Sequence, residues 1–172
     1  GIGNRGVTLD DITDAWGRDE RLLHVREKGR TFCTTRAVLG EEQRMVKLAR
    51  QGQGQLRPLY TDAPDIALEG QQYEAVRHVL TTPHRVSIIR GAAGTGKTTL
   101  MREATRWLEG AGKRVQVVAP TTDAARGVLR EEGFAGAETV ARLLVDKEMQ
   151  ETLRSQVLWV DEAGLLGTQD MT

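Results

Sequence analysis

Apolar residues follow two different patterns along this chain, and the change comes before its middle. In the first part, helical spacing over 9–16 and 38–48 predicts two amphipathic helices, and two short runs over 22–34 predict a hairpin between them. Glycine, glutamine and proline are then frequent over 51–64, which is typical of a linker. We therefore expect a small α+β N-terminal domain, with its linker, over residues 1–66.

After that linker, strand-like apolar runs alternate with amphipathic helical stretches. Three runs predict buried strands, at 86–89, 114–119 and 157–160. Helical spacing predicts helices at 71–80 and 98–108, and further helical stretches follow Thr121 and Thr139. Strands separated by helices form parallel sheets, whose ligand sites lie at the carboxyl ends of the strands. We therefore expect an α/β domain over residues 67–172.

A glycine-rich stretch joins the first of these strands to the helix after it. Gly91, Gly96, Lys97 and Thr98 fit the spacing G-x-x-x-x-G-K-[ST], which is the phosphate-binding loop or Walker A motif. Backbone N–H groups from Gly94 to Thr98 can turn inward together only if the side chains are small and some residues adopt positive φ, as glycine does without strain. The alternative is a glycine-rich turn before a lysine, which average composition produces by chance in under about 1% of chains this long. We predict that this loop binds a nucleotide.

Each residue of the loop has an expected role in binding ATP and Mg²⁺. The Lys97 ammonium would contact the β- and γ-phosphates, and the Thr98 hydroxyl would be a Mg²⁺ ligand. The remaining contacts would come from backbone amides of the loop and of the first helical turn, whose N–H groups have no partner within the helix. The predicted nucleotide-binding residues of this stretch are Gly91, Gly94, Thr95, Gly96, Lys97, Thr98 and Thr99.

Two acidic residues, Asp161 and Glu162, follow the apolar run at 157–160. Opposite a phosphate-binding loop, Asp161 would hold the Mg²⁺ through its water shell beside Thr98. Glu162 would accept a proton from the water that attacks the γ-phosphate. The alternative is a solvated turn that carries two acids. We predict an ATP hydrolase whose catalytic residues are Lys97, Asp161 and Glu162, with Thr98 and Asp161 at the metal.

Composition limits the ligand sites and the cellular compartment that we expect for this protein. The formal net charge of the 172 residues is +0, so any site for a polyanion must be local. Cys33 is the single cysteine, which excludes an internal disulfide and suits a reducing compartment. Because no run of about 18 apolar residues occurs, we expect a cytoplasmic protein that does not enter a membrane.

Five segments together resemble the first RecA-like motor domain of superfamily 1 DNA helicases, in particular the RecD-like branch and the helicase part of TraI/TrwC-type conjugative relaxases. They are similar to the L-x-x-x-Q-x-x-A segment, motif I, motif Ia, motif Ib and the D-E-A-G form of motif II, at 68–75, 91–98, 119–125, 138–144 and 159–164. The stretch at 30–42 is also similar to the segment ahead of the motor in these relaxases. The fold class implied is an incomplete RecA-like P-loop NTPase, with a parallel sheet flanked by helices.

The resemblance implies a motor that couples ATP hydrolysis to 5′-to-3′ movement on single-stranded DNA. Gln72 would hydrogen-bond the adenine, because a glutamine amide both donates and accepts. Pro120, Thr121 and Thr139 would line the DNA path and contact phosphate and sugar. The alternative for both threonines is an ordinary helix N-cap, and one residue can serve both purposes.

Part of the family's pattern does not occur in this sequence. Motif III is absent from it, as is the second RecA-like domain with the arginines that stabilise the γ-phosphate. We therefore expect a piece of a longer motor that binds ATP weakly, hydrolyses it slowly if at all, and needs the remaining helicase domain to unwind DNA. A different hypothesis is a P-loop ATPase that works as a switch or assembly protein and does not act on DNA, which the neutral charge favours.

Overall fold

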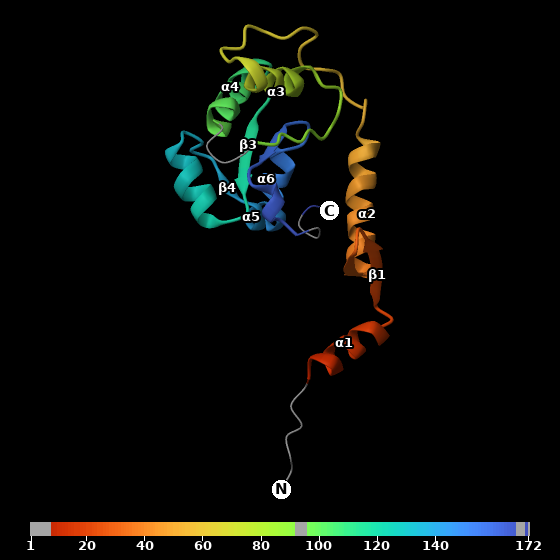
Figure 1. Cartoon of the computed structure of the whole chain (residues 1–172). Coiled ribbons are helices and arrows are strands. Elements are labelled where there is room, and N and C mark those ends of the chain that lie inside the picture. Colours follow the sequence, from red (N-terminus) through yellow and green to blue (C-terminus); the bar gives the residue numbers. More distant parts are fainter. Residues whose placement is uncertain (1–7, 92–95, 168–170, 172) are drawn as a thin grey trace.

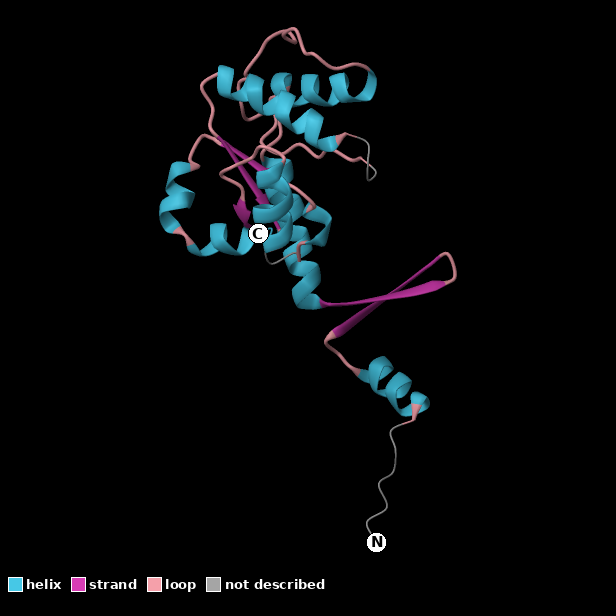
Figure 2. Cartoon of the chain, turned by 90° about the vertical axis from the view of Figure 1, so that its left-hand side faces the viewer, coloured by secondary structure: helices cyan, strands magenta, loops and turns pink. Residues whose placement is uncertain are grey.

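The chain forms an α/β body and an N-terminal arm, residues 8–51, that leads into it (Figure 1). This is a computed structural model, and it describes residues 8–91, 96–167 and 171. In both views the first helix and the hairpin of the arm project away from the body (Figure 2). The assignment of residues 1–66 to a separate domain stays a prediction.

Helix α1 (Leu9–Arg18) opens the arm and is capped at its N-terminus by Thr8. The Thr8 hydroxyl accepts from Asp11 N at 3.2 Å, and the Asp11 carboxylate accepts from Thr8 N at 2.9 Å. These two bonds form a capping box, which satisfies backbone N–H groups that the helix itself cannot pair. The apolar residues of the helix are exposed, however, and they are Leu9, Ile12 and Trp16.

The rest of the arm is the predicted hairpin and second helix. Strands β1 (Leu22–Glu27) and β2 (Arg30–Thr35) pair antiparallel. The turn between them consists of Lys28 and Gly29, with φ of 48° and 76°. Two positive φ values in a two-residue turn match the right-handed twist of the strands. Helix α2 (Arg36–Gln51) follows directly after the hairpin.

The body is built on a three-stranded parallel sheet in the order β4–β3–β5. Its strands are β4 (Glu138–Thr139), β3 (Val115–Ala119) and β5 (Val157–Val160). Because both pairings are parallel, the carboxyl ends of all three strands lie at the same edge of the sheet. The parallel sheet with its connecting helices confirms the predicted α/β, P-loop fold class.

Helices precede the sheet, connect its strands and follow the last of them. They are α3 (Gly70–Thr81), α4 (Lys97–Gly110), the π-helical segment η1 (Asp123–Leu129), α5 (Val140–Val145), α6 (Lys147–Thr152) and the 3-10 turn η2 (Ala163–Leu165). The predicted helices at 71–80 and 98–108 are therefore confirmed as α3 and α4.

Helix α4 lies between helix α3 and the sheet (Figure 1). Leu100 and Leu108 of α4 pack in one core cluster with Leu80 of α3. Met101, on a different side of α4, packs with Val117 of β3. Burying one aliphatic side chain of this size contributes about 1.5–3 kcal/mol. Contacts on two sides therefore determine where α4 lies and where it begins.

The predicted buried strand at 86–89 does not form. These residues have no strand hydrogen bonds, and Val86 and Ile88 are 53% and 81% exposed. An apolar run becomes a strand only if a neighbouring strand pairs with its backbone groups. Strand β5 is an edge of the sheet, and no strand of the described residues pairs with this segment. The prediction was wrong because the run has no pairing partner here.

The predicted linker is packed against the body. Leu56 N donates at 2.9 Å to Pro83 O, which lies just after the end of α3. Tyr60 N donates at 3.1 Å to Leu80 O, which lies within α3. The Tyr60 ring also meets the Trp107 ring edge-on, with centroids 5.9 Å apart. Further along, Ile66 is buried in the cluster formed by α3 and α4. The segment is linker-like in composition, but it covers the outer side of these two helices.

Glu103 joins this segment to helix α4. Its carboxylate accepts from Ala67 N at 3.0 Å, from Trp107 Nε1 at 2.9 Å and from Arg106 Nη2 at 2.6 Å. The hydrogen bond from the Arg106 guanidinium, more than the other two, lowers the pKa of Glu103 to about 2. A carboxylate with three donors is favoured in its charged form.

We predict that Glu103→Gln lowers the free energy of unfolding by about 1–2 kcal/mol at neutral pH, because the charge-assisted hydrogen bonds are lost. Since folding lowers the pKa of Glu103 from 4.5 to about 2, this contribution is complete above pH 4.5 and is lost as the pH falls from there towards 2. Urea unfolding should therefore give a smaller difference from the wild type at pH 4 than at pH 7. Glu109→Gln, an exposed change on the same helix, is the control and should have no effect at either pH. An equal loss at both pH values for Glu103→Gln would contradict the charge-based explanation.

Candidate nucleotide-binding site

The start of helix α4 has the backbone conformation that the phosphate-binding loop requires. Gly96 precedes the helix with φ of 75°, in the left-handed region that glycine adopts without strain. Lys97 and Thr99 are exposed in the first helical turn, and Gly91 is exposed at the other end of the loop. The predicted residues Gly94 and Thr95 lie outside the described part of the chain.

Gln72, the residue expected to bind adenine, lies directly beside the loop. Its Nε2 donates to Gly96 O at 3.4 Å, across 24 positions of sequence. A Cβ atom added to Gly96 would clash with the same Nε2. Glycine is therefore favoured here by φ, and any larger residue would also have to displace the Gln72 amide. The close approach of helix α3 to an amide-rich helix start suits a nucleotide, whose base and phosphates need neighbouring sites.

The two predicted acids lie at the carboxyl edge of the sheet. Asp161 N donates to Val118 O at 2.9 Å, so Asp161 directly extends the pairing of β5 with β3. Its side chain is half-buried, and that of Glu162 is exposed. Glu162 has φ of 50°, which is uncommon for a residue other than glycine and turns the chain sharply into η2.

Thr98 contacts an acid other than the expected one. Its Oγ1 donates to Glu132 Oε2 at 2.9 Å. In the described part of the chain, no hydrogen bond or ion pair joins Thr98 to Asp161, and no group of three His, Cys, Asp or Glu residues lies close enough to hold a metal. Hydroxyl and carboxylate oxygens are the donors that Mg²⁺ prefers. The assignment of Thr98 and Asp161 to one Mg²⁺ ion stays a prediction.

The residues expected to contact DNA gather at the same carboxyl edge. Thr139 pairs with Ala119 across β4 and β3, and Pro120 and Thr121 follow Ala119 directly. The Thr121 hydroxyl accepts from Ala124 N at 3.2 Å. The Thr139 hydroxyl accepts from the backbone at the start of α5, at 3.1 Å. Both threonines therefore make the helix-capping bonds of the alternative interpretation, and their contact with DNA stays a prediction.

Two arginines that belong to none of the predicted site residues contact Glu138, the residue before Thr139. Glu138 accepts from Arg126 Nη2 at 2.9 Å and from Arg130 Nη2 at 2.6 Å. The hydrogen bonds of Arg126 lower the pKa of Glu138 most, and the charges of Arg126, Arg130 and Arg142 lower it further. The spacing of Arg126 and Arg130, about one helical turn, was the signal that could have indicated a shared partner. The cluster brings positive charge to the edge where DNA binding is predicted.

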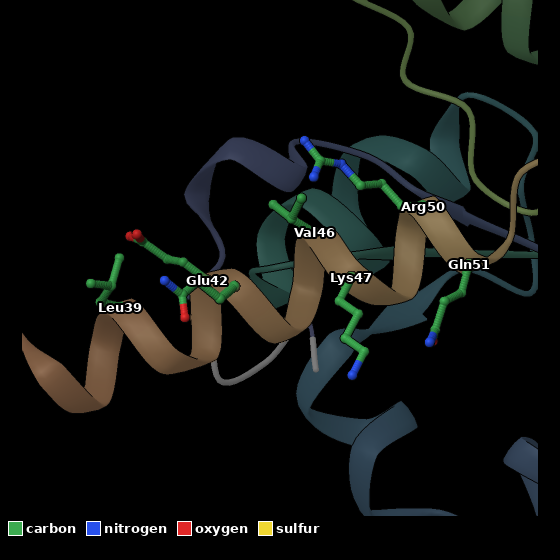
Figure 3. A pocket seen from close by; sticks show the side chains of 7 residues that line it. Leu39, Glu42, Val46, Lys47, Arg50 and Gln51 are labelled. Carbon is green, nitrogen blue, oxygen red and sulfur yellow. The ribbon is translucent and has the colours of Figure 1, made fainter.

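An open hollow lies along helix α2, far in sequence from the loop (Figure 3). The side chains that line it all come from this one helix, and they are Leu39, Glu42, Gln43, Val46, Lys47, Arg50 and Gln51. None of the predicted site residues lines it. Because no second element contributes groups to it, this hollow has no arrangement that would bind a nucleotide.

The body matches a known protein family, and the chain is similar to known conjugation proteins. Residues 67–172 match the family model described as an AAA domain. The chain is 31% identical to the conjugal transfer protein TraA of Rhizobium radiobacter over 147 residues, which are 80% of this chain and 13% of that protein. It is 29% identical to the multifunctional conjugation protein TraI of Escherichia coli over 156 residues, which are 83% of this chain and 9% of that protein.

A probable conjugal transfer protein TraA of Sinorhizobium fredii is 34% identical over 105 residues, which are 60% of this chain and 9% of that protein. The chain thus spans about a tenth of the length of these relatives. Within the described residues, no helix is both long enough and apolar enough to span a bilayer.

We predict that Gly96→Ala weakens nucleotide binding at least tenfold, because the added methyl group would displace Gln72 and would require an alanine at φ of 75°. Fluorescence titration with a labelled adenine nucleotide measures the affinity, and thermal unfolding checks that the variant is folded. The matched control is Gly127→Ala, where an added Cβ meets nothing within 4 Å. Equal affinity of Gly96→Ala and the control would contradict the placement of the nucleotide beside Gln72.

Proposed function

Because residues 67–172 belong to the AAA domain family, we propose that this chain is the ATP-binding part of a DNA helicase within a conjugative relaxase. The observation that carries the proposal is the start of α4, where left-handed Gly96 lies beside Gln72. The phosphates of ATP would bind at the amide-rich helix start and its adenine at Gln72. The names of the relatives, which are conjugal transfer and conjugation proteins, support the conjugative setting.

In this proposal each site residue has one task. Lys97, exposed in the first turn of α4, pairs with the β- and γ-phosphates. Thr98 and Asp161 are the oxygen donors that we assign to Mg²⁺, which neutralises phosphate charge when bound. Glu162, exposed after the sharp turn at the end of β5, accepts the proton of the attacking water. The reaction class is hydrolysis of the γ-phosphate of ATP.

We assign single-stranded DNA to the carboxyl edge of β3 and β4. Pro120, Thr121 and Thr139 follow or end these two adjacent strands, so a strand of DNA could contact all three. The guanidinium groups of Arg126 and Arg130, which form salt bridges with Glu138, add positive charge to this edge. Contacts to phosphate and sugar bind without reading sequence, as a translocating motor requires. The 5′-to-3′ direction rests on the family resemblance alone.

We propose that the chain by itself turns ATP over slowly. The arginines that stabilise the γ-phosphate in this family belong to a second RecA-like domain that these 172 residues do not contain. Unwinding then needs the remaining helicase domain of the same polypeptide. An ATPase switch that never contacts DNA is the second candidate, which the net charge of +0 favours. ATPase assays of the longer protein distinguish the two, since only a motor is stimulated by single-stranded DNA.

Replacing Lys97 by alanine should weaken ATP binding at least tenfold and leave the fold intact, because the exposed ammonium contributes charge to the phosphates and nothing to the core. Equilibrium binding of a fluorescent ATP analogue, together with circular dichroism, tests this. Lys47→Ala, which removes an exposed lysine of helix α2, serves as the control. Unchanged affinity of the Lys97→Ala variant would show that the nucleotide does not bind at this loop.

Thr121→Asp should separate a DNA contact from a helix cap. Aspartate caps a helix about as well as threonine, so the melting temperature should stay within a few degrees of the wild type. The added negative charge should nevertheless weaken single-stranded DNA binding several-fold at low salt, because it repels phosphate. Fluorescence anisotropy with a labelled oligonucleotide measures this. Thr35→Asp makes the same change at the cap of α2 and should not alter DNA affinity; equal affinities for both variants would contradict the assigned DNA path.

A further inference from the structure

Glu132 has no role in the proposed site, yet its side chain reaches a predicted metal ligand. The Thr98 hydroxyl donates to Glu132 Oε2 at 2.9 Å, and both residues are half-buried. A hydroxyl has one proton and two lone pairs. When its proton is donated to a carboxylate, the oxygen lone pairs remain available for a cation, and the hydrogen bond holds them in one orientation.

Glu132 is held in place from both sides. Its N–H donates to Val128 O at 2.9 Å, and its carbonyl accepts from Arg102 Nε at 2.7 Å. Gly133 then reverses the chain with φ of 101°, so that Phe134 is buried in the core. The end of the helical stretch that contains η1 is thereby attached to helix α4. The position of the carboxylate is therefore built into the fold and does not require a bound nucleotide.

Asp161, the expected partner of Thr98, makes no hydrogen bond with it in the described part of the chain. The backbone of Asp161 continues the pairing of β5 with β3 at Val118. Within the described residues, the hydrogen bond of the Thr98 side chain goes to Glu132 and to no other carboxylate. A group that orients a metal ligand typically contributes 10–100-fold to metal affinity without touching the metal.

We infer that Glu132 is a positioning residue for magnesium, whose carboxylate orients the Thr98 hydroxyl and adds negative charge beside the ion. This inference rests on the proposed nucleotide site and extends it by one residue. It requires only oxygen donors, which are the ligands that Mg²⁺ prefers. No sequence motif pointed to it, because Glu131, Glu132 and Gly133 read as an ordinary end of a helix.

The test is the magnesium dependence of nucleotide binding. A labelled ADP is titrated with the whole chain at a series of Mg²⁺ concentrations, which gives the Mg²⁺ concentration for half-maximal binding. Glu132→Gln keeps the size of the side chain and an acceptor oxygen but removes the charge. We expect it to raise this midpoint about tenfold, while binding at saturating Mg²⁺ stays close to the wild type. Glu131→Gln, one residue earlier and exposed, is the matched control and should leave the midpoint unchanged.

A pair of further variants keeps the test decisive. In Thr98→Val the hydroxyl is absent, so adding Glu132→Gln should raise the midpoint by less than it does in the wild-type chain. An unchanged midpoint for Glu132→Gln, in a variant that melts at the same temperature as the wild type, would overturn the inference. A lower midpoint would overturn it as well, because Glu132 would then compete with the metal for Thr98. If the wild-type chain binds labelled ADP no better than Lys97→Ala does, the proposed function itself fails.

Discussion

The burial of helix α4 on two sides is the constraint on which the rest of the structure depends. Leu100 and Leu108 face helix α3, and Met101 faces strand β3, so the helix can neither rotate nor slide without exposing apolar surface. The start of the helix is thereby placed so that Gly96 contacts Gln72 and Thr98 contacts Glu132. The polar contacts at the helix start are few, and the apolar contacts along the rest of the helix fix their geometry.

The sequence alone predicted what depends on local pattern. Helices α3 and α4, strands β3 and β5 and the hairpin of the arm follow from the spacing of apolar residues. The capping bonds of Thr121 and Thr139 follow from their position before a helix. Residues 86–89 show the limit of this reasoning. Their apolar run has the composition of a buried strand, but pairing needs a second strand at the right distance, and composition contains no information about that neighbour.

Some residues of the candidate site were predictable from the sequence, and others only from the folded structure. The loop motif predicted Gly96 and its left-handed backbone, and the resemblance predicted Gln72, which the fold brings next to it from 24 positions away. Glu132 lies 34 positions from Thr98 and belongs to no motif, so only the packing of η1 beside α4 reveals their contact. The cluster of Arg126 and Arg130 around Glu138 also could not be read from a motif. These three charged residues form one group only after the chain has turned back.

The segment before helix α3 has a consequence for how this protein can be divided. Tyr60 donates its hydroxyl proton to Trp107 O at 2.9 Å, and Ile66 is 6% exposed among the side chains of α3 and α4. A polypeptide that starts at residue 67, where the match to the family model begins, would leave Leu80 and Leu108 without part of their cover. A polypeptide that keeps the body intact therefore includes residues 56–66 as well as those that match the family model.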